Sequence, residues 1–162
     1  LAVCKRNVIC HGLEDAVQLF ESDLFEVLEG KEILKQVQDD GRKNYHPELV
    51  SGSLPTPQQI FNLIVSNPPY IESKAIETLQ PEVRMYEPSM ALDGGEDGMD
   101  FYRLLAHKAG KFLTNDGNII LEIGFGQAQD VTKIFTENGF HLKDIKKDLA
   151  GVERALCFAK ND

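Results

Sequence analysis

The residues of this sequence best suited to chemistry are Asn67-Pro68-Pro69-Tyr70, called here the Asn67–Tyr70 segment. Asn67 offers a side-chain oxygen as an acceptor, and Tyr70 offers a flat aromatic face. Two consecutive prolines fix φ and supply no N–H, so nearby carbonyl oxygens lack their usual partners. The segment therefore suits a substrate bearing –NH2, with one N–H donated to the Asn67 side chain and the other to the Pro68 carbonyl.

Such a site favours alkylation of a planar amide or amine nitrogen. An amide nitrogen is a poor nucleophile because its lone pair is delocalised, and two accepted hydrogen bonds would raise its electron density and aim it at a methyl donor. Proximity and orientation would supply most of the rate, and no general base is required. The alternative is an ordinary turn, since Asn-Pro marks turns by default.

The position of the segment favours a site over a turn. Residues 60–66 are a near-continuous apolar run, which is typical of a parallel strand buried on both faces. In open α/β sheets ligands bind beyond the carboxyl ends of the strands, and the segment begins there. Further strands are predicted over 16–21, 118–123, 140–146 and 153–160.

Helices are predicted between these strands. Asp100 is expected to cap an amphipathic helix whose apolar stripe is Phe101, Leu104, Leu105, Ala109, Phe112 and Leu113. Another helix should follow Gly124-Phe125-Gly126, with Val131, Ile134 and Phe135 inward and Gly139 at its end. Residues 1–12 are predicted to be the end of a helix, 72–80 a short helix, 81–99 a structured loop and 115–117 a turn.

The order of elements predicts an α/β fold with a Rossmann-like sheet. The last two strands are joined only by the turn over 148–151, so they must be antiparallel, because a parallel crossover needs about a dozen residues. A parallel sheet with one antiparallel last strand is typical of class I methyltransferases. Residues 29–59 lack any apolar period and are expected to be a disordered insertion within a partial catalytic domain spanning 1–162.

The composition bounds the function. The 162 residues suit one domain, and the net charge of −9 argues against nucleic acid as the main partner. The three cysteines are expected to be reduced thiols of a cytoplasmic protein, and the scattered histidines predict no metal site. No apolar run reaches the ~20 residues of a membrane span. The chain lacks an initiator Met and is expected to begin within a longer protein.

Several motifs together resemble the HemK/PrmC family, the release-factor glutamine N5-methyltransferases. The matching stretches are Val65–Ile71, Leu79–Val83, Tyr86–Pro88, Ala91–Gly95, Asp97-Gly98, Phe101–Arg103, Leu121–Gly124, Lys147–Gly151 and, upstream, Asn7, His11–Leu13 and Asp23–Phe25. The NPPY tetrapeptide alone is shared with nucleic-acid adenine and guanine N-methyltransferases. The set over 79–103 is much narrower.

The resemblance implies roles for the matched positions. Asn67 and Pro68 would hold the glutamine amide, with Pro69 beside them and Tyr70 as a wall of the pocket. Asp23, Leu24 and Asn67 would lie on the side of the cofactor, S-adenosyl-L-methionine. Glu82 and Arg84 would shape the substrate side, or else form a surface ion pair. For Asp23 the alternative is a cap at a strand end. The partner implied is a peptide chain release factor.

The sequence also departs from the family. Its glycine-rich loop, its ribose-binding acid and its N-terminal helical domain are absent. Gly124-Phe125-Gly126 is no substitute, since a third glycine would fall at 129, which is Gln, and the pair is interpreted as a tight turn. Two alternatives to the glutamine methyltransferase therefore stay open. One is a nucleic-acid adenine or guanine N-methyltransferase, and the other is an inactive remnant that binds no cofactor.

Overall fold

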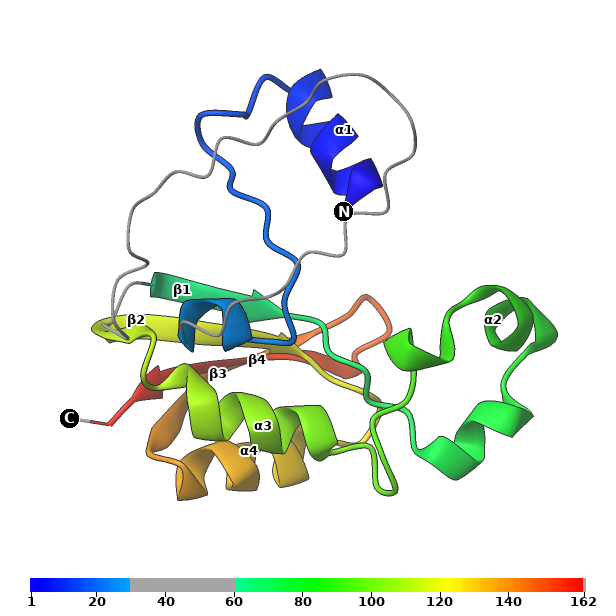
Figure 1. Ribbon diagram of the computed structural model, residues 1–162. Helices are drawn as coiled ribbons and strands as arrows, with labels where there is room; N and C mark the ends of the chain where they lie inside the picture. The colour runs from blue at the N-terminus through cyan, green and yellow to red at the C-terminus, as the bar shows by residue number, and fades with distance from the viewer. Residues whose placement is uncertain (30–60, 162) are drawn as a thin grey trace. The chain divides into compact units, whose positions relative to one another are not determined.

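The computed structural model describes residues 1–29 and 61–161 (Figure 1). The insertion expected over 29–59 lies outside the described residues from residue 30 onward. The chain divides into two units, Leu1–Pro57 and Gln58–Asp162, and each is described by itself.

The first unit contains helix α1 (Ala2–Cys10) and the 3-10 helix η1 (Glu26–Glu29). The helix predicted at the start of the chain is confirmed, and Gly12 follows it at φ 64°, a conformation that favours glycine. The strand predicted over 16–21 is wrong, because these residues form turn and irregular backbone. Alternating apolar residues become a strand only where a neighbouring strand can pair with them, and the described part of this unit contains none.

The second unit is built on a four-stranded sheet in the order β1-β2-β4-β3. Its strands are β1 (Phe61–Ser66), β2 (Leu113–Glu122), β3 (Phe140–Lys147) and β4 (Glu153–Lys160). β1 pairs parallel with β2, whereas β4 is antiparallel to both β2 and β3. β1, β2 and β3 therefore run in one direction, with β4 inserted against them. This confirms the Rossmann-like sheet with an antiparallel last strand.

The turn that reverses the chain before β4 is held by Asp148. Its Oδ1 accepts the N–H of Ala150 at 2.8 Å and that of Val152 at 3.0 Å. The N–H of Asp148 donates in turn to the Val152 carbonyl at 2.8 Å. The N–H groups of Val152, which has the largest effect, and of Ala150 lower the pKa of the Asp148 carboxyl. A turn this tight can only return the chain antiparallel to β3.

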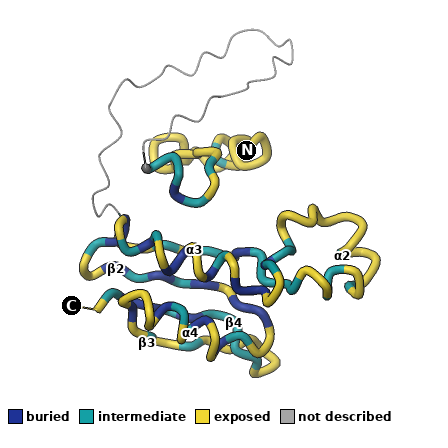
Figure 2. The backbone as a smooth tube through the Cα atoms, turned by 60° about the horizontal axis from the view of Figure 1, so that its bottom comes forward, coloured by how far each residue is buried: buried dark blue, intermediate teal, exposed yellow. Residues whose placement is uncertain are grey.

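Helices α3 (Asp100–Ala109) and α4 (Ala128–Glu137) both cover one face of this sheet (Figure 1). The fully buried residues come from these helices, from the strands and from the residues that flank them, and Figure 2 colours the buried positions of the backbone dark blue. The largest of them are Tyr102, Phe112, Leu113, Ile119, Leu121, Ile123, Val131, Phe135, Phe140, Leu156 and Phe158. On the opposite face of β1, Leu63 and Val65 are 51% and 68% exposed. Burial of this strand on both faces was therefore the wrong expectation.

The buried face of helix α3 differs from the apolar stripe that the sequence predicted. Its N-cap is Met99, so Asp100 is the first helical residue and not the cap. The buried face is Tyr102, Leu105, Ala106 and Ala109, whereas Leu104 is 44% exposed. The helix ends four residues before Leu113, which already begins β2. The turn predicted at 115–117 falls inside β2, where the register against β1 shifts.

The segment after the Asn67–Tyr70 segment is more helical than predicted. A 3-10 helix, η2 (Ser73–Thr78), replaces the expected short helix, and a second one, η3 (Ser89–Ala91), lies within 81–99. The same stretch, predicted as a loop, also contains helix α2 (Pro81–Tyr86). Pro81 stands at its first turn, where proline's fixed φ and missing N–H do no harm. Figure 1 shows α2 standing off from the sheet.

Candidate functional site

The Asn67–Tyr70 segment follows the last residue of β1 directly, at the carboxyl end of the strand. Pro68 is buried, whereas Asn67 is exposed. Among the described residues, none hydrogen-bonds the Asn67 side chain, and no backbone N–H donates to the Pro68 carbonyl. Both acceptors that the sequence predicted for an –NH2 group are therefore without a hydrogen-bond partner among the described residues.

A short parallel bridge fixes the backbone immediately after this segment. Ile71 pairs with Asp93; its N–H donates to the Leu92 carbonyl at 3.0 Å, and its carbonyl accepts the Gly94 N–H at 2.8 Å. The Asp93 carboxylate accepts the Ser73 hydroxyl at 2.7 Å and the Gly95 N–H at 3.0 Å. These donors, Ser73 first, lower the pKa of the Asp93 carboxyl. The Ala91–Gly95 motif thus holds the chain that leaves the site.

Glycines in the same loop allow the backbones to meet. A Cβ on Gly94 would lie 2.7 Å from the Tyr70 Cα. On Gly98, which also has φ 74°, a Cβ would lie 2.5 Å from the Tyr70 carbonyl oxygen. Real Cβ atoms do not approach backbone so closely, so only glycine fits these two buried positions. The physical basis of the Leu92–Gly95 and Asp97-Gly98 motifs is close packing against Tyr70.

A residue that sequence reasoning missed, Gln127, completes the support of this backbone. Its Nε2 donates to the Tyr70 carbonyl at 2.9 Å, and its Oε1 accepts the Gly124 N–H at 2.9 Å. The hydroxyl of the buried Tyr102 donates to the Glu122 carbonyl at 3.0 Å and lies 3.4 Å from Gln127 Oε1. Gln127 comes directly after the Gly124-Phe125-Gly126 turn, but nothing in its local sequence pointed to Tyr70.

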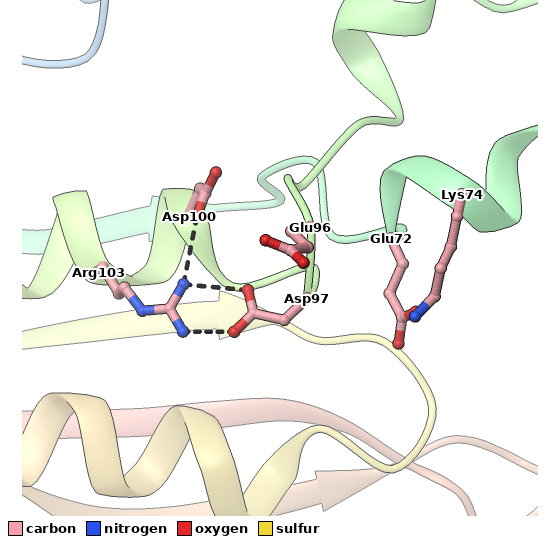
Figure 3. Close-up of a pocket in the computed structure, with 6 residues that line it drawn as sticks. All are labelled: Glu72, Lys74, Glu96, Asp97, Asp100 and Arg103. Atoms are coloured by element: carbon pink, nitrogen blue, oxygen red, sulfur yellow. Dashed lines mark hydrogen bonds and ion pairs between the residues drawn. The ribbon is translucent and has the colours of Figure 1, made fainter.

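Beside this backbone lies a pocket of about 450 Å³ whose lining is wholly charged (Figure 3). Its residues are Glu72, Lys74, Glu96, Asp97, Asp100 and Arg103. None of the predicted site residues lines it. The Lys74 ammonium pairs with Glu72 at 3.1 Å, and Arg103 extends its guanidinium to Asp97 and Asp100 (Figure 3). The pocket's two cations are therefore engaged by its own carboxylates.

Arg103 and Asp97 form an exposed ion pair at the pocket, and this pairing shifts the pKa of both groups. Arg103 Nη1 donates to Asp97 Oδ1 at 3.0 Å and to Asp100 Oδ1 at 3.2 Å, and Nη2 donates to Asp97 Oδ2. The hydrogen bond from Arg103 lowers the pKa of Asp97 to about 2. Asp97 Oδ1 also accepts the Met99 N–H at 3.1 Å, so the pair ties the loop to the start of α3.

The remaining predicted site residues lie elsewhere. Glu82 and Arg84 are exposed on α2, and Arg84 Nη1 donates to the Glu77 carbonyl at 3.0 Å. No ion pair joins Glu82 to Arg84, both of which the structure describes. Asp23 and Leu24 belong to the first unit, at the turn before η1, where Leu24 has φ 48°. No strand ends there, so the alternative of a strand-end cap at Asp23 does not hold.

Within the described ranges, no three His, Cys, Asp or Glu residues gather closely enough to hold a metal ion. None of the described helices has the length and apolar character of a membrane span. What the arrangement can do chemically is accept hydrogen bonds. It offers the Asn67 oxygen and the Pro68 carbonyl at the end of a strand, backed by a rigid support.

The chain is similar to curated release factor glutamine methyltransferases, although no family model matches it. It is 51% identical to the one of Agrobacterium fabrum over 100 residues, which is 62% of this chain and 35% of that protein. It is 39% identical to the one of Geobacter sulfurreducens over 156 residues, which is 96% of this chain and 44% of that protein. The chain therefore spans less than half the length of these relatives.

Among solved structures, a methyltransferase from Pyrococcus furiosus covers 65% of this chain and 43% of its own, at 22% identity and a TM-score of 0.45. The sequence relatives do confirm the resemblance that the motifs predicted. By sequence, this chain is similar over 96% of its length to part of a release factor glutamine methyltransferase.

Proposed function

We propose that the protein containing this chain methylates N5 of a glutamine side chain in a peptide chain release factor, with S-adenosyl-L-methionine as the methyl donor. One observation supports this above all. At the carboxyl end of β1, the Asn67 side chain and the Pro68 carbonyl have no hydrogen-bond partner among the described residues, so both acceptors remain for one –NH2 group. The names of the relatives supply the substrate class.

In this proposal, the chain's own residues bind and aim the amide. One N–H of the glutamine donates to the Asn67 oxygen and the other to the Pro68 carbonyl, which directs the nitrogen lone pair away from the segment. Tyr70, whose ring packs on Gly124, forms the wall of the site. The nitrogen becomes acidic as it is alkylated, so its proton leaves to solvent and no general base is needed.

The cofactor supplies an electrophilic methyl group on a sulfonium when it is bound. The two unpaired acceptors fit the methyl-accepting side of such a site. The family's glycine loop and ribose-binding acid do not occur in this sequence, so the chain itself holds only part of what binds the cofactor. Asp23 and Leu24 are the further cofactor contacts that we propose. We place the reaction in the cytoplasm, as a release factor modification that serves translation termination.

The test is methyl transfer to purified release factor by this chain joined to the N-terminal part of a full-length relative. Mass spectrometry should find the added methylene, about 14 Da, on a glutamine. This assay tests the chemistry of the site directly, which the fold alone does not determine. Transfer only to DNA or ribosomal RNA would favour the nucleic-acid alternative. If no transfer occurs and calorimetry finds no cofactor binding, the remnant is supported instead.

Asn67→Ala should lower turnover by roughly 10²–10³-fold, as losing one preorganised polar group does in other enzymes. Asn115→Ala, an exposed asparagine of β2, is the matched control and should leave turnover unchanged. Asn67→Asp keeps the acceptor but adds a charge beside a sulfonium that must lose its own, so turnover should fall without weaker cofactor binding. An undiminished rate in Asn67→Ala would show that the site is wrong.

A further inference from the structure

We infer that Gln127 is a positioning residue for the Asn67–Tyr70 segment, and this inference rests on the proposed function of that segment. Its carboxamide links the Tyr70 carbonyl to the Gly124 N–H, each at 2.9 Å, and is called here the Gln127 bridge. The two partners belong to the loops that follow β1 and β2, neighbouring parallel strands. The Gln127 bridge therefore locks together the two strand ends at which a ligand would bind.

The partners of the bridge require a carboxamide at this position. The Tyr70 carbonyl can only accept and the Gly124 N–H can only donate, so the group between them must do both. A flipped amide would set NH2 against N–H and oxygen against oxygen. A carboxylate at 127 would satisfy Gly124 but would oppose the Tyr70 carbonyl with a second acceptor. Glutamate is thus a nearly isosteric residue that removes the function of the bridge.

The loops pack closely around the Gln127 bridge. A Cβ on Gly124 would lie 2.7 Å from Gln127 Oε1 and 2.9 Å from Tyr70 Cδ2. A Cβ on Gly98 would lie 3.0 Å from Gln127 Nε2. The carboxamide is therefore enclosed from two loops, both contacts being possible only because these residues are glycines. These contacts and the two hydrogen bonds restrict the carboxamide of the half-buried Gln127.

Tyr102 supports the bridge from within the core. Its buried hydroxyl lies 3.4 Å from Gln127 Oε1 and donates to the Glu122 carbonyl at 3.0 Å. Burial raises the pKa of this hydroxyl well above its usual range, so it keeps its proton and its role as a donor. The bridge is thereby connected to α3 and to the end of β2 as well as to α4.

The two prolines transmit this constraint to the site. Pro68 and Pro69 have fixed φ angles, so few torsions remain free between Asn67 and the anchored Tyr70 carbonyl. On the other side, Ser66 is held by its pairing with Leu121 in β2. The segment is fixed at both ends, and loosening one end lets both acceptors drift. Misplacing a reacting group by about 1 Å can lower a rate by about 10²-fold.

The first measurement uses the chain as it stands and needs no activity. The Ile71 and Gly94 amides form the short parallel pairing with Asp93 that follows Tyr70. In Gln127→Glu, hydrogen exchange should show these two amides losing protection by about 10-fold or more. Gln129→Glu is the matched control: it is exposed, lies two residues away in α4 and makes the same chemical change. Amides between β2 and β4 should keep their protection in both variants.

Gln127→Met, which removes both hydrogen bonds without adding a charge, should give the same local loss. Unchanged protection at Ile71 and Gly94 would overturn the inference. So would an equal loss between β2 and β4 in both Gln127 variants, because Gln127 would then serve the whole fold.

The second measurement uses the chain joined to the N-terminal part of a full-length relative. Gln127→Glu should lower kcat by about 10–100-fold and change KM by less than about twofold, because misplaced acceptors misalign the nitrogen while most of the contacts that bind a protein substrate are unchanged. The deficit should shrink as the pH falls toward the carboxyl pKa, about 4.3 for an ordinary glutamate, since a protonated carboxyl can again donate to Tyr70. An unchanged kcat would refute the positioning role. If the unmodified protein transfers no methyl group to glutamine, the proposed function fails while the exchange result still decides whether Gln127 positions the segment.

Discussion

Gly98→Ala tests the close packing behind Tyr70, because the new methyl group has nowhere to go. Gly98 has φ 74°, and a Cβ there would lie 2.5 Å from the Tyr70 carbonyl oxygen and 3.0 Å from Gln127 Nε2. Gly139 is the matched control, since it has φ 85° and no heavy atom within 4 Å of the same Cβ. Both substitutions force alanine into left-handed backbone, but only Gly98→Ala adds a steric clash.

The two costs can be separated. Left-handed backbone costs an alanine about 1–2 kcal/mol, so Gly139→Ala should lower the free energy of unfolding by that amount. At Gly98 the carbonyl of Tyr70 must also move, and overpacking adds about 1–3 kcal/mol. Gly98→Ala should therefore cost about 2–5 kcal/mol in total.

Urea unfolding of the two variants and the unmodified chain measures the difference. With a slope of about 1.5 kcal/mol per molar, the extra loss at Gly98 should lower the midpoint by a further 0.7–2 M or so relative to Gly139→Ala. The probe should report on the sheet of the second unit, such as near-ultraviolet signals of its buried aromatic residues. Equal midpoints for the two variants would refute the claim that Gly98 is required by the approach of Tyr70.

Two further outcomes are expected. Arg103→Leu should raise the pKa of Asp97 from about 2 toward 3.8. NMR titration of the Asp97 carboxyl carbon measures this change. Because the folded pKa is depressed, Asp97 stabilises the fold above about pH 4 and loses that contribution as the pH falls toward 2, and the variant should lose this dependence. Val131→Ala, at a fully buried position, should lower the free energy of unfolding by about 2 kcal/mol. Val65→Ala, at a position 68% exposed, should change it by less than about 0.5 kcal/mol, and a similar loss in both variants would contradict the one-sided core.

Periodicity and turn length predicted much of the second unit. The apolar run that ends at Ser66, the helix ended by Gly139 and the antiparallel last pair of strands are all present, because each depends on neighbours in sequence. The same local logic failed over 16–21, where alternation found no partner strand, and at Asp100, where the helix begins one residue earlier than a cap at that position requires. It also missed α2, although proline at position 81 was a usable signal.

The NPPY segment and its place after a strand could be read from the sequence, since both are local. The insertion of β4 between β2 and β3, and the bond from Gln127 to Tyr70, required the tertiary structure. Gln127 and Tyr70 lie 57 residues apart, and the residues around neither one predict a contact with the other. Their meeting depends on the pairing of β1 with β2, which brings the two strand ends together, and on glycines at 94, 98 and 124 that let three loops pack at backbone distance. Long-range contacts of this kind are set by how whole elements pack, so patterns among neighbouring residues in the sequence do not predict them.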